Sequence, residues 1–235
     1  MSPAPGHATV LLIGASRGLG YAIAAEYLDR GARVVATVRS TSSTALDDLA
    51  GPAAGRLEAE HVDINEPGQV WALRDRLAGR TFDLLFVNAG VTQHDPETTT
   101  ADVSTEEFTR LMVTNALSPM RVIETLGPLV AADGTIAIMS SGQGSVANNE
   151  RGGFEIYRAS KSALNQLMRS YAARRRDDPR TLLLTAPGWV KTDLGGPGAR
   201  LTIGESIPSL VTTIDAQRGR GGLQYLDYRG ETVAW

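Results

Sequence analysis

The sequence predicts an α/β fold with a doubly wound parallel sheet, formed by a single three-layer domain over residues 1–235. The main observation is that short apolar runs rich in β-branched residues alternate with stretches of helical period along the chain. This alternation is typical of a parallel sheet covered by helices on both faces. In addition, the run at residues 82–87 is almost wholly apolar, as in a strand buried on both faces. Residues 1–8, rich in Pro, Gly and Ala, are expected to form a flexible tail.

The expected strands are apolar or alternating runs, and they lie at residues 9–13, 33–38, 57–62, 82–87, 135–139, 181–185 and 223–226. The expected helices lie at residues 18–28, 66–77, 104 onward, 157–175 and 205–215. Ser104 begins its helix with Glu107 three residues later, which is the pattern of a capping box. Because crossovers between parallel strands are right-handed, this order of elements gives a doubly wound sheet.

Composition excludes several classes of protein. The chain has no cysteine, which excludes disulfides, a thiolate nucleophile, Cys-based zinc sites and iron–sulfur clusters. Its three histidines are too scattered for a three-His zinc site, so no metal centre is expected. The net charge of −3 gives no reason to expect nucleic acid as a partner. Neither a secretion signal nor a membrane-length apolar run is visible, so we expect a cytoplasmic protein that does not contact membranes.

Glycine is over-represented, and the first expected strand runs directly into a glycine-rich loop, GASRGLG, that opens a helix. Glycine allows a tight turn and a close approach to a pyrophosphate, and the helix N-terminus offers unpaired N–H groups to it. The spacing is G-x-x-x-G-x-G, and such a run can also be a plain turn, but its strand–turn–helix context favours a dinucleotide site. The expected contacts are Gly14, Ser16, Arg17, Gly18, Leu19 and Gly20.

The end of the second strand indicates which dinucleotide is bound. An NAD-dependent enzyme usually has an acidic residue there for the ribose 2′-hydroxyl, but this chain has Arg39. Arg39 and Arg17 together suit a 2′-phosphate, which a guanidinium binds in bidentate fashion. Either arginine alone is more often a surface cation. The pair, with the acid missing, favours NADP(H) over NAD(H) as the cofactor.

The next two strands end in further candidate cofactor contacts. Asp63, followed by Ile64, could accept a hydrogen bond from the adenine amino group. Asp63 could equally form the start of the helix that follows it. The fourth strand ends in Asn88, Ala89 and Gly90, whose small side chains would let the cofactor lie across the sheet edge.

The fifth strand ends near Ser141, and Tyr157 and Lys161 follow it at i and i+4 on one helix face. A free tyrosine has a pKa near 10 and is a poor acid–base group at neutral pH. We expect the Lys161 ammonium to lower the pKa of Tyr157, because a nearby cation favours the phenolate. Ser141 could donate a hydrogen bond to the carbonyl oxygen that Tyr157 protonates. This combination suits hydride transfer to a ketone or aldehyde.

With these motifs the chain resembles the short-chain dehydrogenase/reductase family over nearly its whole length. The matching segments are GASRGLG, NAG at 88–90, Asn115, Ser141, YRASK at 157–161 and PGWVKT at 187–192. Within the family it is most similar to the C-factor-like and sniffer-like carbonyl reductases. The family usually has Thr where this chain has Ile13, and Asn where it has Val87.

The resemblance implies a role for each matching residue. Tyr157 would be the general acid/base, and Lys161 would tune it and bind the nicotinamide ribose. Ser141 would orient the substrate, Asn115 would hold a relay water, and the 4-pro-S hydride would be transferred. The segment that contacts the nicotinamide would contain Pro187, Gly188, Val190 and Thr192.

Asn115 and Pro119 together allow a more detailed hypothesis. Pro119 has no N–H, so the Asn115 carbonyl loses its i+4 donor and the helix should kink there. We expect the freed carbonyl to hold a water that links solvent to Lys161 and Tyr157. A kink that serves packing alone is the alternative.

The substrate is less constrained than the cofactor. Candidate pocket walls are His94, Gln143, Phe154 and Trp189, which suit a medium-sized apolar or aryl carbonyl compound, although each could equally serve packing. The glycine-rich segment 193–201 resembles a small mobile lid, which predicts broad specificity. A second function class is a nucleotide-binding regulatory or signalling protein of the same fold with little turnover. The family commonly forms dimers through helices equivalent to 104–126 and 157–175, so a homodimer is expected.

Overall fold

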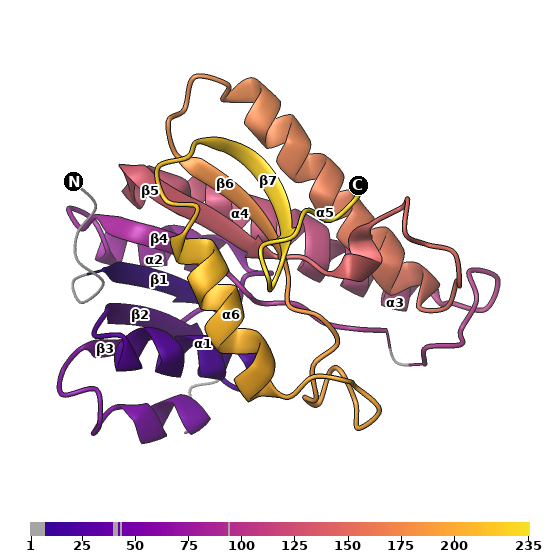
Figure 1. Cartoon of the computed structure of the whole chain (residues 1–235), viewed down its shortest axis with the longest axis horizontal. Helices are drawn as coiled ribbons and strands as arrows, with labels where there is room; N and C mark the ends of the chain where they lie inside the picture. Colours follow the sequence, from indigo (N-terminus) through magenta and orange to yellow (C-terminus); the bar gives the residue numbers. More distant parts are fainter. Residues whose placement is uncertain (1–7, 40–41, 43, 94) are drawn as a thin grey trace.

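The computed structural model describes residues 8–39, 42, 44–93 and 95–235. Within them, seven parallel strands form one sheet in the order β3-β2-β1-β4-β5-β6-β7 (Figure 1). The strands are β1 (Thr9–Ile13), β2 (Arg33–Val38), β3 (Leu57–His61), β4 (Phe82–Val87), β5 (Val130–Met139), β6 (Thr181–Ala186) and β7 (Gly222–Asp227). The predicted doubly wound, Rossmann-type sheet is therefore confirmed.

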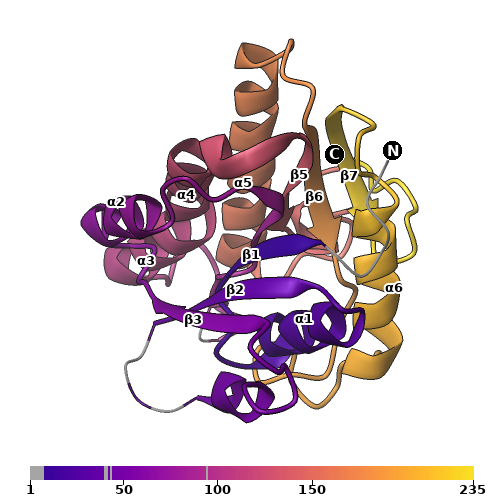
Figure 2. The ribbon, with the colours of Figure 1, turned by 90° about the vertical axis from the view of Figure 1, so that its left-hand side faces the viewer.

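Helices cover both faces of this sheet, which gives the predicted three layers. Figure 2 shows α1 and α6 on one face and α2, α3, α4 and α5 on the other. The helices are α1 (Gly18–Asp29), α2 (Pro67–Arg76), α3 (Thr105–Met112), α4 (Ser118–Leu126), α5 (Glu155–Arg174) and α6 (Ile203–Asp215). None of the described helices is both long and apolar enough to cross a membrane.

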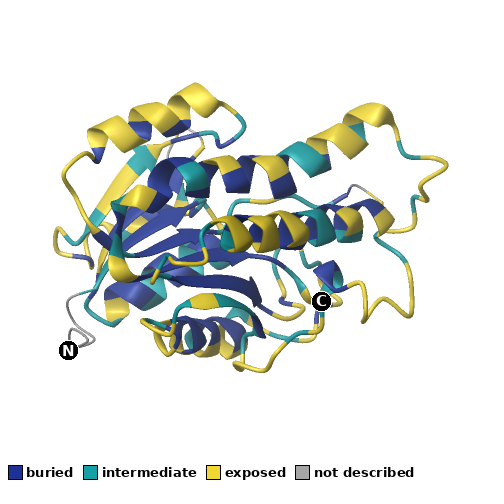
Figure 3. Ribbon diagram, turned by 90° about the horizontal axis from the view of Figure 1, so that it is seen from above, coloured by how far each residue is buried: buried dark blue, intermediate teal, exposed yellow. Residues whose placement is uncertain are grey.

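Burial follows from the position of each strand in the sheet. The central strands β1, β4 and β6 are almost fully buried, as expected of apolar runs that are covered on both faces (Figure 3). The edge strand β3 carries acidic side chains instead, the exposed Glu58 and the half-buried Glu60, which form ion pairs with Arg80 and Arg76. Charge on an edge strand discourages pairing with another chain.

Several elements begin or end away from their predicted limits. β5 begins at Val130, upstream of the expected start, and α6 begins at Ile203 rather than at residue 205. The reason for the second difference is a capping box, in which Thr202 Oγ1 accepts from the Glu205 N–H and the Glu205 carboxylate accepts from the Thr202 N–H. At Ser104 the expected cap is present, since its Oγ accepts from the Glu107 N–H at 3.1 Å.

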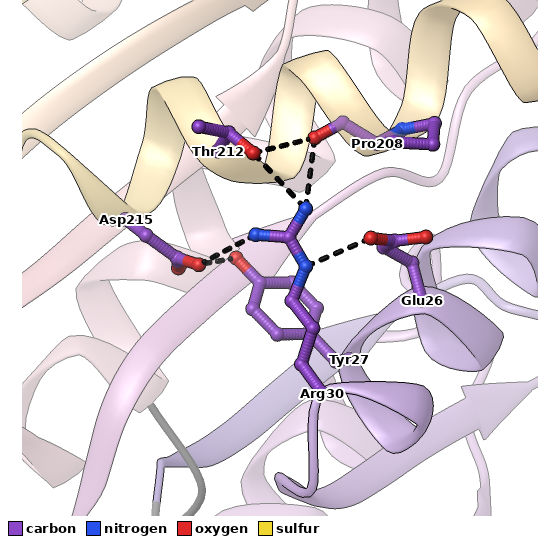
Figure 4. Close-up of polar contacts among 6 residues, drawn as sticks. All are labelled: Glu26, Tyr27, Arg30, Pro208, Thr212 and Asp215. Carbon is purple, nitrogen blue, oxygen red and sulfur yellow. Dashed lines mark hydrogen bonds and ion pairs between the residues drawn. The ribbon is translucent and has the colours of Figure 1, made fainter. Parts of the chain in front are cut away.

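One arginine connects α1 to α6. Figure 4 shows the Arg30 guanidinium between the two helices, where Nε donates to Glu26 at 2.8 Å and another nitrogen donates to the Pro208 carbonyl at 2.9 Å. Arg30 also contacts Asp215, which accepts from the Tyr27 hydroxyl at 3.2 Å. Because α6 follows directly on the loop after β6, these bonds help to fix one side of the candidate site.

Candidate active site

The carboxyl ends of the strands open into a cleft of about 670 Å³. It lies where the strand order reverses, between β1 and β4, which is the usual ligand site of such sheets. Most of the site residues expected from the sequence line it. They are Gly14, Ser16, Arg17, Gly18, Leu19, Arg39, Asp63, Ile64, Asn88, Ala89, Gly90, Ser141, Gln143, Phe154, Tyr157, Lys161, Pro187, Gly188, Trp189, Val190 and Thr192.

Three of the expected residues are placed differently. His94 lies outside the described residues. Asn115 is fully buried behind the cleft wall, and Gly20, in the first turn of α1, packs against the Gly14 carbonyl and does not line the cleft. No group of His, Asp or Glu side chains suited to a metal ion occurs within residues 8–39, 42, 44–93 and 95–235.

The glycine-rich loop is held by contacts from neighbouring strands. Gly14 has φ +91°, its N–H donates to Thr37 Oγ1 at 3.0 Å, and its carbonyl accepts from Asn88 Nδ2 at 2.7 Å. A Cβ on Gly20 would lie 2.0 Å from that carbonyl and 2.6 Å from Asn88 Nδ2. Gly20 therefore allows α1 to pack closely against the loop, which is a role in shaping the site rather than in lining it.

We expect Gly20→Ala to destabilise the protein by about 1–3 kcal/mol, because the added methyl group overlaps the loop. Gly68, in α2, is a matched control, since a Cβ there meets nothing within 4 Å. Gly68→Ala should leave stability unchanged or raise it by up to about 1 kcal/mol. Chemical denaturation measures both effects. A Gly20→Ala protein as stable as the Gly68→Ala protein would contradict this account.

The two departures from the family pattern do not disturb the turn after β4. The side chains of Ile13 and Val87 are buried in the core. The backbone makes the connection, because the Ile13 carbonyl accepts from the N–H groups of Asn88 and Ala89 at 2.9 and 3.0 Å.

The two candidate phosphate-binding arginines lie at the same cleft. Arg17 forms a 3.1 Å ion pair with Asp193, and both of these side chains are largely exposed, at 75% and 81%. Such an exposed pair is weak, so Arg17 can exchange it for another anion at little cost. Asp63 does not start the helix that follows it, because α2 begins at Pro67 with Glu66 as its N-cap. Its Oδ1 instead accepts from the Asn65 N–H at 2.9 Å in the loop before that helix, and Asp63 also lines the cleft.

The side chains expected to perform chemistry lie together at the other end of the cleft. Tyr157 and Lys161 project from α5 and are 9% and 3% exposed. Lys161 Nζ lies 5.9 Å from the centre of the Tyr157 ring and donates to the Met139 carbonyl at 2.9 Å. The Ser141 side chain is close enough to Tyr157 to lower the pKa of its hydroxyl by hydrogen bonding.

The pKa of Tyr157 corrects one prediction from the sequence. Burial raises it to about 12 and outweighs the lowering effect of the Ser141 hydrogen bond. Burial also lowers the pKa of Lys161 to about 8. Desolvation by burial is therefore the largest effect on the pKa of both groups, and Tyr157 is less acidic than a free tyrosine. At neutral pH both side chains hold their protons, which suits proton donation.

A buried ammonium lowers the stability of the folded protein. Lys161→Met should therefore raise the free energy of unfolding of the cofactor-free protein at pH 7 by up to about 3 kcal/mol, because one pKa unit corresponds to about 1.4 kcal/mol. Below the folded pKa of about 8 both states hold the proton, and the folded state bears the full burial cost. This cost vanishes as the pH rises to the ordinary pKa of 10.5, so the gain should vanish as well. Denaturation at pH 7 and at pH 10.5 measures this gain in stability. Lys191→Met is the control, because Lys191 is exposed. A gain that does not vary with pH would contradict this origin.

A π-helical turn lies where the sequence predicted a helix kink. Helix α3 ends at Met112, and residues Val113–Leu117 form a π-helical turn before α4, which contains Pro119. Asn115 lies in this turn, where its side chain accepts from the Val91 N–H and donates to the Val91 carbonyl, both at 2.8 Å. It also donates to Ser160 Oγ at 2.9 Å.

Sequence reasoning missed two residues next to the candidate catalytic side chains. Gln93 is buried, and its side-chain oxygen accepts from the Tyr157 N–H at 3.1 Å, which caps the start of α5. Tyr225, in β7, donates its hydroxyl to the Ser141 carbonyl. Ser160, by contrast, could have been found within YRASK; its Oγ donates to the Tyr157 carbonyl at 2.8 Å. The contacts of Gln93 and Tyr225 join residues far apart in sequence, so no local sequence pattern predicts them.

The aromatic residues named as pocket walls, Phe154 and Trp189, both line the cleft. Phe154 has φ +50°, which is rare for a residue with a side chain, and its N–H donates to the Pro96 carbonyl at 2.9 Å. Trp189 is 52% exposed, and its Nε1 donates to the Gly195 carbonyl at 2.7 Å. The segment expected to be a lid thus folds against Trp189.

Comparisons with known proteins agree with this geometry. A family model described as enoyl-(acyl carrier protein) reductase matches residues 14–202. A Burkholderia multivorans protein, described as a short-chain dehydrogenase/reductase and solved with bound NADP, is 59% identical with a TM-score of 0.95, over 97% of this chain and 99% of that one. A carbonyl reductase from Pseudomonas aeruginosa PAO1 in complex with NADP is 36% identical with a TM-score of 0.90, over 97% and 100%. The C-signal of Myxococcus xanthus is 36% identical over 155 residues, which are 65% of this chain and 92% of that protein.

Proposed function

Because the chain belongs to the short-chain dehydrogenase/reductase family, we propose that it reduces ketones or aldehydes to alcohols with NADPH, or catalyses the reverse oxidation. The observation that best supports this proposal is that Ser141, Tyr157 and Lys161 face the same cleft as the glycine-rich loop. A binding module would not need a buried lysine beside a buried tyrosine, because each is costly to desolvate.

The cleft fits a dinucleotide. Residues 14–17 of the glycine-rich loop lead into the N-terminus of α1, where backbone N–H groups would bind the pyrophosphate. NADPH would supply the hydride when bound. Tyr157 would donate its proton to the substrate oxygen, and Ser141 would hold that oxygen by a hydrogen bond. Lys161 would bind the nicotinamide ribose and stabilise the phenolate that remains.

We further propose that NADP(H) is preferred over NAD(H). Support comes from Arg39 and Arg17 at the cleft, from the lack of an acid at the end of β2, and from the NADP bound in two similar structures. The water held by the Asn115 carbonyl stays a proposal of the same kind, supported by the π-helical turn next to Pro119.

The test is loss of absorbance at the reduced-nicotinamide band, measured with a varied panel of ketones and aldehydes. We expect NADPH oxidation with several aryl and medium-sized apolar carbonyl compounds. Activity on one compound alone would contradict broad specificity. No turnover with any compound, despite tight NADPH binding, would contradict the reductase proposal.

That last outcome would favour the second candidate function, a nucleotide-binding regulatory or signalling protein with little turnover. Its support is the similarity to C-signal, which covers 65% of this chain. The set of Ser141, Tyr157, Lys161 and Asn115 argues for the enzyme instead, because a regulator requires only the part of the cleft that binds nucleotide.

We also propose a homodimer. Phe108 in α3, Leu117 in the π-helical turn and Leu167 in α5 are each about two-fifths exposed, and these three elements contact one another. Light scattering after gel filtration should give the mass of two chains for the native protein. Leu117→Arg with Leu167→Arg should give one chain, because two charges from each chain would have to be buried at the interface. A native protein that is monomeric at micromolar concentration would contradict the dimer.

A further inference from the structure

We propose that Tyr225 is a positioning residue for Ser141, and that Trp235 holds Tyr225 in place. This inference rests on the proposed function, because it concerns how the Ser141 hydroxyl is oriented toward the substrate oxygen. Tyr225 is not among the described residues that line the cleft, so it would act through Ser141 and not on the substrate itself.

The contact between the two residues is direct, and it is buried on the Tyr225 side. Tyr225 lies in β7 with 1% of its surface exposed, and its hydroxyl donates to the Ser141 carbonyl. The same carbonyl accepts from the Gly144 N–H at 2.8 Å, so both of its lone pairs are used. Burial raises the pKa of Tyr225, so its hydroxyl keeps the proton that it donates.

Ser141 stands at a change of direction in the chain. It follows β5 with an extended backbone, and its Oγ caps the short helical turn Gly142–Gly144 by accepting from the Gln143 N–H at 3.1 Å. On one side this turn is tied to α5, since Asn165 donates to the Gly144 carbonyl at 3.1 Å. The Tyr225 hydroxyl, from β7, donates to the Ser141 carbonyl. The loop is therefore held by hydrogen bonds from both α5 and β7.

The last residues of the chain hold Tyr225 against this loop. The rings of Trp235 and Tyr225 lie 5.4 Å apart, and the Arg169 guanidinium lies 4.4 Å from the centre of the Trp235 ring. The Tyr225 carbonyl accepts from the Val233 N–H at 2.9 Å, and the Trp235 carbonyl accepts from the Ala147 N–H at 3.0 Å. Segment 225–235 therefore contacts the active-site loop at Ser141 and again at Ala147.

Loss of one of these contacts should slow catalysis, because displacing an active-site group by about 1 Å can lower the rate by up to 10²-fold. We expect Tyr225→Phe to lower kcat about 10-fold while leaving the dissociation constant of NADPH unchanged. Tyr171→Phe is the matched control, since Tyr171 is equally buried but its hydroxyl lies near Gly127, just after α4, and not against the loop. The control should keep the native kcat. An unchanged kcat for Tyr225→Phe would overturn the proposal.

A double-mutant cycle separates positioning of Ser141 from a general structural role. In a Ser141→Ala background, Tyr225→Phe should cause no further loss of kcat, because the hydroxyl that it positions is gone. Trp235→Leu should lower kcat less than Tyr225→Phe, and should also lose its effect in that background. Multiplicative losses in the double variants would overturn the inference. If Ser141→Ala alone left kcat unchanged, the proposed function itself would fail instead.

Discussion

Replacing Tyr157 with Phe is expected to lower kcat for carbonyl reduction roughly 10³-fold, within the range that general acids contribute. The ring is retained and only the hydroxyl is lost, so the cleft keeps its shape. Lys161 and the glycine-rich loop stay in place, and the dissociation constant of NADPH should change less than about twofold. Steady-state kinetics and fluorescence titration of NADPH measure the two effects separately.

The control for this variant is again Tyr171→Phe, which removes a buried tyrosine hydroxyl from the same helix without touching the cleft. If Tyr157→Phe kept more than a tenth of the native kcat, the hydroxyl would not be the proton donor. A parallel loss of NADPH binding would show that the variant damages the cleft rather than the chemistry.

Exchanging Arg39 for Asp is expected to raise the KM for NADPH about 100-fold while changing that for NADH much less. A charge-assisted hydrogen bond contributes about 1.5–3 kcal/mol, and the new carboxylate also repels the 2′-phosphate. NADH has a 2′-hydroxyl in place of the phosphate, and this hydroxyl can donate a hydrogen bond to the new carboxylate. The measurement is kcat/KM for both cofactors with one carbonyl substrate.

Arg33 offers a matched control on the same strand. It lies at the amino end of β2, whereas Arg39 directly follows the carboxyl end that opens into the cleft. Arg33→Asp changes the net charge of the protein equally and should affect both cofactors alike. Equal losses for NADPH and NADH in the Arg39→Asp protein would refute the phosphate assignment.

Much of the fold could be predicted because local and global preferences agree. The run that forms β4 is apolar throughout and lies in the middle of the sheet, so its pattern and its burial coincide. Boundaries were predicted less well where a polar segment joins an element. Gly134 and its neighbours interrupt the apolar pattern of β5, yet the strand begins at Val130 because pairing with Phe82 extends it.

The glycine-rich loop, Ser141, Tyr157 and Lys161 could be located from the sequence, because each follows a strand or shares a helix face. The direction of the Tyr157 pKa could not, because it depends on burial by distant segments and not on the i+4 spacing to Lys161. Gln93 and Tyr225 escaped prediction for a related reason. Each reaches the site from a segment more than 60 residues away, through a single hydrogen bond.

The proposed reaction in this cleft transfers a hydride from NADPH to a carbonyl carbon. The most direct measurement uses NADPH deuterated at the 4-pro-S position, with mass spectrometry of the alcohol formed from an aryl ketone. We predict that the alcohol carries one deuterium on its carbinol carbon, and that NADPH deuterated at the 4-pro-R position gives none. An alcohol without deuterium from either cofactor, or no alcohol at all, would contradict the account.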